Sequence, residues 1–128
     1  MRELVRKAGL SDKIETDSAA ITREEIGHDM YPPARKKLTQ MHIPFEKRAA
    51  RQVTAQEIRA CDYVRLMDAS NRTLLRRLVG DPAEKALPLL PDRYVADPWY
   101  TGDFDTAYDD ILEGCTALLQ TIRREHGI

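Results

Sequence analysis

Short apolar segments of strand length alternate with amphipathic helical segments along this chain, and this alternation constrains the fold more than any other feature. The clearest strand is predicted at 63–67 (YVRLM), an apolar run bounded by aspartates. Two further short strands are predicted at 14–19 (IETDSA) and 87–90, where Pro88 favours the edge of a sheet. Strands that alternate with helices indicate an α/β fold, a parallel β-sheet with helices on both faces.

Local signals define the helices of the first half. Residues 1–9 are helical in character, and Gly9 suits the C-terminal cap, although no capping side chain precedes the helix. The segment 20–31 is polar and predicts a loop. A helix is then predicted from Pro32 to about Met41, because proline fits the first turn of a helix.

The second half carries stronger helix signals. Thr54 and Glu57 form a capping box at the start of a helix that is predicted to end near Ala60. Ser70 is predicted to cap a helix that Gly80 ends. A loop at 91–104 then leads into a long amphipathic helix from about Asp105. Its apolar positions follow the 3.6-residue period and are Tyr108, Ile111, Leu112, Cys115, Leu118, Leu119 and Ile122.

Composition narrows the class of protein. The 128 residues predict a single domain, and a hydrophobic fraction of 42% is too high for a disordered chain. A net charge of −1 and the lack of an apolar run of about 20 residues argue against nucleic-acid and membrane partners. The two cysteines, Cys61 and Cys115, have neither metal nor disulfide-framework spacing, so we expect buried structural thiols in a cytoplasmic protein. No motif predicts a metal or a cofactor.

The loop 95–103 (VADPWYTGD) is the most unusual segment of the chain. Pro98 restricts Asp97 to extended conformations and so fixes the direction of its carboxylate. A carboxyl group beside the aromatic rings of Trp99 and Tyr100 suits a general acid in a pocket for a flat ring. The alternative is a turn in which Trp99 is a packing anchor, and the loop taken alone favours that interpretation.

Two other groups of residues lie where parallel sheets place their sites. Ser18 and Asp68 follow predicted strands and suit a crevice at the carboxyl ends of those strands. Their residue types equally suit turns and helix caps, which is the favoured interpretation. Glu24 and Glu25 lie in the long loop after the first predicted strand, either reaching over a site or forming a solvated charge pair.

Taken together, these segments resemble the low-molecular-weight protein tyrosine phosphatases. The matching pieces cover essentially the whole chain in the order of the family, and the Asp-Pro-aromatic-Tyr loop and ARQVT are fairly specific. They are IETDSAA at 14–20, EIG at 25–27, ARQVT at 50–54, DYVRLMDASN at 62–71 and DPWYTGDFDTAYDDI at 97–111. The related arsenate reductases share the fold but need additional redox cysteines, which this sequence does not show.

The resemblance implies a three-layer α/β/α domain and a two-step reaction on a phosphotyrosine protein or a small aryl phosphate. A cysteine thiolate attacks phosphorus, and an aspartate, matching Asp97, protonates the leaving phenol oxygen and later activates water. Trp99 and Tyr100 match the aromatic residues at the mouth of the pocket. Glu24 falls at an aromatic wall position. Ser18 matches a serine that supports the phosphate-binding loop, and a histidine of the same network is replaced by Arg48.

The nucleophile of that reaction is not among the residues of this sequence. Neither Cys61 nor Cys115 has an arginine six positions downstream, as the Cys-x5-Arg loop of the family requires. The resemblance therefore implies that residues 1–128 are an N-terminally truncated domain without its first, central strand. We expect such a chain to be inactive, and either to rearrange its sheet or to pair strands with another copy, as a homo-oligomer. The alternatives are a non-catalytic phosphate-binding or protein-interaction module and a fragment with no function of its own.

Overall fold

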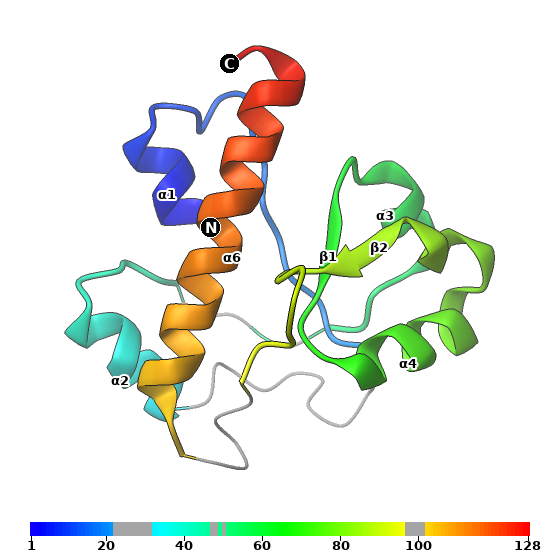
Figure 1. The fold of residues 1–128 in the computed structure, drawn as a ribbon, viewed down its shortest axis with the longest axis horizontal. Helices are drawn as coiled ribbons and strands as arrows, with labels where there is room; N and C mark the ends of the chain where they lie inside the picture. Colours follow the sequence, from blue (N-terminus) through cyan, green and yellow to red (C-terminus); the bar gives the residue numbers. More distant parts are fainter. Residues whose placement is uncertain (22–31, 47–48, 50, 97–101) are drawn as a thin grey trace. The chain divides into compact units, whose positions relative to one another are not determined.

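A long C-terminal helix, α6 (Phe104–His126), organises one part of the computed structural model, which describes residues 1–21, 32–46, 49, 51–96 and 102–128 (Figure 1). The chain forms two compact units. Unit 1 comprises Met1–Asp17, Pro32–Phe45 and Ala96–Ile128, and unit 2 comprises Ser18–Tyr31 and Glu46–Val95. Each unit is described separately.

Capping residues set both ends of α6. The Asp103 carboxylate accepts hydrogen bonds from the Thr106 backbone N–H at 3.0 Å and from the Thr106 hydroxyl at 2.6 Å. Gly127, with φ of 64°, adopts the left-handed conformation that ends many helices. The predicted long helix is thereby confirmed, and it begins at Phe104.

Helices α1 (Arg2–Lys7) and α2 (Pro32–Gln40) pack against α6 in unit 1 (Figure 1). Val5 is 2% exposed and clusters with Leu10 and with Leu119 of α6. At the other end of α6, Lys37 of α2 forms an ion pair with Asp105 and lies 5.5 Å from the centre of the Tyr108 ring. Both predicted helices are confirmed, and α1 begins without a side-chain cap, as its sequence indicates.

The buried face of α6 differs from the predicted stripe. Ile111 and Leu112 are 39% and 38% exposed, whereas Asp110 is only 7% exposed. The helical period is as predicted, but its phase brings a carboxylate and small residues inward where two branched apolar residues were expected. The buried residues of this helix are Ala107, Asp110, Gly114, Cys115, Leu119 and Ile122.

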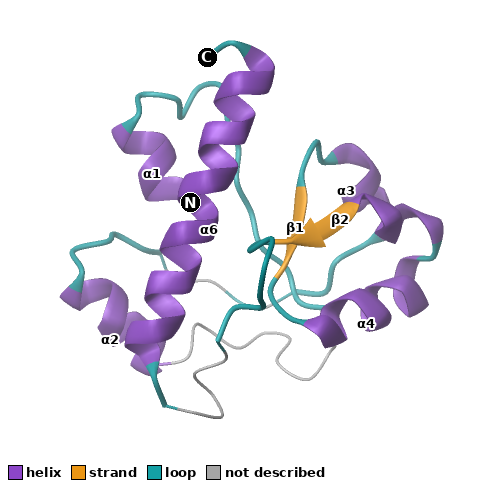
Figure 2. Cartoon of the chain, viewed as in Figure 1, coloured by secondary structure: helices purple, strands orange, loops and turns teal. Residues whose placement is uncertain are grey.

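Unit 2 is built on a two-stranded parallel sheet of β1 (Val64–Leu66) and β2 (Ala86–Pro88) (Figure 2). Val64 pairs with Ala86, and Leu66 pairs with Pro88. Proline has no N–H to donate, and the next residue continues the pairing instead: the Leu89 N–H donates to the Leu66 carbonyl at 2.9 Å. The predicted strand at 63–67 is confirmed in shortened form, and the one predicted at 87–90 is found two residues earlier at its C-terminal end and one residue earlier at its start, as Ala86–Pro88.

Helix α3 (Ala55–Ala60) starts at the predicted cap. The Thr54 hydroxyl accepts a hydrogen bond from the Glu57 backbone N–H at 3.2 Å, and the Glu57 carboxylate forms an ion pair with Arg51. At its C-terminal end, the Lys85 ammonium donates to the carbonyls of Ile58, Arg59 and Cys61 at 2.9, 3.0 and 2.6 Å.

Helix α4 (Ala69–Val79) is capped by Asp68, so the prediction of Ser70 as its cap is wrong. Asp68 and Asn71 form a reciprocal capping box, in which each side chain accepts from the backbone N–H of the other. Ser70 lies two residues too late for this geometry, and its hydroxyl donates to the Asp68 carboxylate at 2.6 Å. Gly80, with φ of 71°, ends the helix as predicted.

The core of unit 2 brings the sheet together with α3, α4 and the 3-10 helix η1 (Asp81–Lys85). Leu75, on the inner face of α4, is 2% exposed and Ala86 is fully buried. Burial of a leucine side chain of this kind stabilises a fold by about 1.5–3 kcal/mol. The buried members of this cluster are Ile58, Leu66, Leu75, Ala83 and Ala86.

Two sequence-based predictions in this part of the chain are wrong. Residues 14–19 form no strand, because a strand needs a hydrogen-bonded neighbour. A single parallel bridge, between Ala20 and Gln52, comes directly after this segment. Cys61 is exposed rather than buried, because it is the C-terminal cap of α3. Cys115 is buried as predicted. In the described ranges, no helix has the length and apolar character needed to cross a membrane.

Candidate functional site

Most of the predicted site lies outside the described residues. Asp97, Trp99, Tyr100 and Glu24 all belong to the segments 22–31 and 97–101, as does Glu25, and Arg48 lies outside the described ranges too. What the structure does place is the chain on either side of the loop at 97–101.

The N-terminal flank of this loop is fixed to α6. The backbone N–H of Ala96 donates to Asp110 Oδ2 at 3.0 Å. The carboxylate that accepts this hydrogen bond is 7% exposed, and it lies on the second turn of the helix. A buried carboxylate usually has hydrogen-bond partners. This hydrogen bond joins Ala96, the residue before Asp97, to helix α6.

The C-terminal flank is fixed to the same helix. Gly102, with φ of 70°, makes the left-handed turn that precedes Asp103, the N-cap of α6. The Thr106 hydroxyl and, after it, the Thr106 backbone N–H hold the pKa of the Asp103 carboxyl below its ordinary value of 3.8. The ionised carboxylate is therefore the form that caps the helix and anchors the end of the loop.

Asp68 and Ser18, the two residues predicted to follow strands, lie in different surroundings. Asp68 is the cap of α4, and its carboxylate accepts hydrogen bonds from Ser70 and from Asn71, so the capping interpretation holds for it. Ser18 is exposed and lies two residues before the bridge between Ala20 and Gln52.

The two cysteines lie in different surroundings. Cys61 is the exposed C-terminal cap of α3, where its carbonyl accepts a hydrogen bond from the Lys85 ammonium, and Cys115 is buried in the middle of α6. In the sequence, neither residue begins a Cys-x5-Arg loop.

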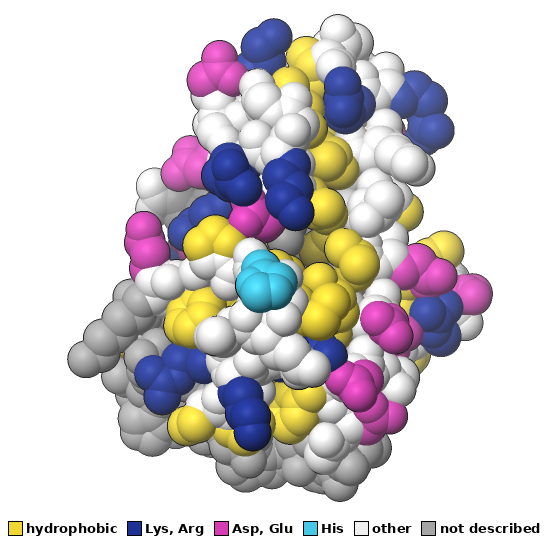
Figure 3. All heavy atoms as spheres, turned by 90° about the vertical axis from the view of Figure 1, so that its left-hand side faces the viewer, with side chains coloured by type: hydrophobic (Ala, Val, Ile, Leu, Met, Phe, Trp, Pro, Cys, Tyr) yellow, Lys and Arg dark blue, Asp and Glu magenta, His cyan; other side chains and the backbone are white. Residues whose placement is uncertain are grey.

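Among the described residues, neither a metal-ligand cluster nor a charged patch on the face drawn in Figure 3 marks a second site. On the face drawn in Figure 3, basic and acidic side chains are interspersed with apolar ones, with no large field of one sign. In the part of the chain that the structure describes, no cluster of three or more His, Cys, Asp or Glu side chains has the geometry to hold a metal ion.

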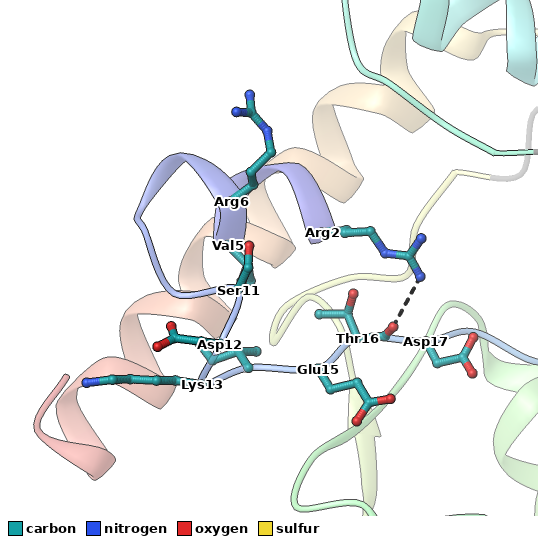
Figure 4. A pocket seen from close by; sticks show the side chains of 10 residues that line it. Arg2, Val5, Arg6, Ser11, Asp12, Lys13, Glu15, Thr16 and Asp17 are labelled. Atoms are coloured by element: carbon teal, nitrogen blue, oxygen red, sulfur yellow. Dashed lines mark hydrogen bonds between the residues drawn. The ribbon is translucent and has the colours of Figure 1, made fainter.

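A hollow of about 710 Å³ lies beside α1 and the turn that follows it. Arg2 reaches across it to the Thr16 carbonyl at 3.4 Å, while the side chains of Arg6, Lys13 and Glu15 point in different directions (Figure 4). Ligand pockets have polar groups that converge on one place. This hollow lacks that convergence.

Asp110 is the residue at this site that sequence reasoning missed. Its residue type suggested a solvated position on the polar face of the helix. The available signal was its spacing, because Asp110 lies three residues after Ala107 and four before Gly114, on one side of the helix.

The chain is similar in sequence to known proteins over nearly its whole length. A sequence profile described as low molecular weight phosphotyrosine protein phosphatase matches residues 1–127. The low molecular weight protein-tyrosine-phosphatase YfkJ of Bacillus subtilis is 35% identical over 131 aligned residues, which cover 97% of this chain and 84% of that protein. The human low molecular weight phosphotyrosine protein phosphatase is 31% identical, with 93% and 81% covered.

Solved structures show the same relationship. The crystal structure of YfkJ superposes with a TM-score of 0.89, covering 97% of this chain and 82% of that one. A low molecular weight protein tyrosine phosphatase from Streptococcus pyogenes, at 26% identity, gives a TM-score of 0.81 over 87% and 75%. The expected α/β fold with a parallel sheet is thus confirmed. The chain belongs to the low-molecular-weight protein tyrosine phosphatase family.

Proposed function

We propose that this chain carries the acid–base half of a phosphotyrosine phosphatase site and lacks the nucleophile half. Family membership supports the reaction class, the hydrolysis of phosphomonoesters of tyrosine or of small aryl alcohols. The observation that carries the proposal for this chain is the segment with Asp97-Pro98, which is flanked by two residues held to α6: the Ala96 N–H donates to the Asp110 carboxylate, and the Asp103 carboxylate accepts from the Thr106 N–H.

In the proposed reaction, Asp97 serves as general acid and then as general base. A thiolate attacks phosphorus, the bond from phosphorus to the phenol oxygen breaks, and the Asp97 proton goes to that oxygen. Asp97, then ionised, takes a proton from the water that hydrolyses the phosphocysteine. The first step needs a thiolate and an arginine in a Cys-x5-Arg loop, and no stretch of this sequence contains one.

The same family resemblance suggests which residues line the pocket. Trp99 and Tyr100 are proposed to line the mouth, and Ser18 to support a phosphate-binding loop by a hydrogen bond. At Glu24 a carboxylate replaces an aromatic ring, which removes stacking on that side and shifts substrate preference away from purely aromatic contacts.

The test is turnover of p-nitrophenyl phosphate and of a phosphotyrosine peptide by the purified chain and by its Asp97→Asn variant. We expect no hydrolysis above the uncatalysed rate from either protein. Hydrolysis by the unmodified chain that the Asp97→Asn substitution abolishes would show that a nucleophile is present, and would refute the proposed lack of activity.

A non-catalytic module is the second candidate function, and the lack of a Cys-x5-Arg motif favours it. Calorimetry with phosphotyrosine distinguishes the two, because a binding module gives saturable heat without turnover. We expect no tight binding, since strong phosphate recognition needs the arginine and a helix N-terminus. The homo-oligomer and the cytoplasmic location expected from the sequence stay predictions, and size-exclusion chromatography tests the first.

A further inference from the structure

Asp110 is a carboxylate on the buried face of α6, where charged side chains are rare. It is 7% exposed, and it lies on the face of α6 that also buries Ala107 and Gly114. Removing a charged carboxylate from water is unfavourable unless hydrogen bonds replace the lost hydration. A residue that only fills space on this face would be apolar, so the carboxylate indicates a specific hydrogen-bonding task.

One hydrogen bond of Asp110 indicates such a task. Its Oδ2 atom accepts the N–H of Ala96 at 3.0 Å, across fourteen positions of sequence. Ala96 is covalently joined to Asp97, and its own segment has no regular secondary structure. A carboxylate oxygen is a strong hydrogen-bond acceptor, so this contact is well suited to hold Ala96 in place.

The other end of the loop is held one turn earlier on the same helix. Asp103 caps α6 through two hydrogen bonds from Thr106. The described residues on either side of positions 97–101 are therefore both held to α6, Ala96 by Asp110 and Asp103 by Thr106.

We infer that Asp110 is a positioning residue for the segment that carries the proposed acid: through the Ala96 N–H it holds the residue that precedes Asp97 in the chain. The inference rests on the proposed role of Asp97 for its functional meaning. The positioning itself is a property of the loop and is measurable without catalysis.

The experiment compares the unmodified chain with Asp110→Ala, Asp110→Asn and a matched control, Asp109→Ala, which removes the same charge from the exposed neighbouring position. Amide hydrogen exchange of Ala96, followed by NMR, reports the hydrogen bond itself. Acrylamide quenching of the fluorescence of Trp99, the one tryptophan of the sequence, reports the loop. Far-UV circular dichroism shows whether α6 remains folded in each variant.

We expect Asp110→Ala to speed the exchange of the Ala96 amide by about ten- to a hundredfold, the factor for a hydrogen bond to a charged acceptor. Quenching of Trp99 rises, while the helix content stays unchanged. Asp110→Asn, which keeps a side-chain oxygen in place, restores most of the protection. Asp109→Ala matches the unmodified chain in both measurements.

Folded Asp110→Ala protein with unchanged exchange at Ala96 and unchanged quenching of Trp99 would overturn the inference. If that variant does not fold, the unmodified chain still decides, because an Ala96 amide that exchanges at the rate of an unstructured peptide excludes the hydrogen bond. Neither measurement depends on a reaction of Asp97. An intact Ala96 hydrogen bond together with a loop that has no part in catalysis would refute the proposed function alone.

Discussion

Replacing Lys85 by methionine tests how unit 2 joins α3 to its sheet. The Lys85 ammonium has three N–H donors, and the structure uses all of them on the carbonyls of Ile58, Arg59 and Cys61. These carbonyls belong to the last turn and cap of α3, which have no partners within the helix. The same cation also faces the negative end of the helix dipole.

The magnitude follows from these contacts. A single hydrogen bond contributes about 0.5–1.5 kcal/mol net, and water replaces part of that at an exposed side chain such as Lys85. Methionine keeps the apolar stem of the lysine, so lost packing contributes little. We therefore expect the free energy of unfolding to fall by about 2 kcal/mol. For a chain of 128 residues this corresponds to a decrease in Tm of about 7 °C.

The assay is thermal and urea unfolding followed by far-UV circular dichroism. Glu84→Gln is the matched control, because Glu84 precedes Lys85 and forms a surface ion pair with Arg76 in which both side chains are more than half exposed. Such a pair contributes at most about 1 kcal/mol. A Lys85→Met variant no less stable than Glu84→Gln would refute the reasoning, since the three carbonyls would then not depend on the ammonium group.

Three further substitutions test other parts of the fold. Leu75→Ala, at a side chain 2% exposed in the core of unit 2, should lower the free energy of unfolding by about 2–5 kcal/mol in a urea titration; a loss as small as that of a surface substitution would contradict the core described. Asp68→Ala should lower it by about 1 kcal/mol and Ser70→Ala by less, because Asp68 is the cap of α4; the reverse order would restore the sequence-based assignment. Asp103→Ala should lower Tm at neutral pH. Because folding lowers the pKa of the Asp103 carboxyl, its contribution is complete above the ordinary value of 3.8 and is lost as the pH falls through the lower, folded-state pKa. A Tm difference between the two proteins that stays constant through that acid range would contradict this.

The elements that the sequence predicted well are those whose signals are local. Thr54 and Glu57 are three residues apart and form the N-terminal cap of α3, and the apolar run at 63–67 contains β1, which pairs with β2. Helix α6 was equally clear, because its period repeats over 23 residues. In each case the residue pattern of the segment itself carries the signal.

The features that were missed depend on distant partners. The segment 14–19 has a strand-like sequence, but a strand exists only where another chain segment pairs with it. Asp110 was missed because its burial depends on Ala96, fourteen positions earlier. The exposure of Cys61 follows from its place at the end of α3, which composition does not reveal. The family resemblance, in contrast, could be predicted from the sequence, because it depends on several short motifs that occur in the order of the family.

In the proposed function, this chain has the acid of a phosphotyrosine phosphatase and no cysteine able to act as its nucleophile. The most direct measurement is a search for phosphocysteine. The unmodified chain and Asp97→Asn are mixed with p-nitrophenyl phosphate, quenched in acid and examined by intact-protein and peptide mass spectrometry. We predict no phosphoryl group on Cys61 or Cys115 in either protein. A phosphorylated cysteine at either position, formed with release of p-nitrophenol, would contradict the claim.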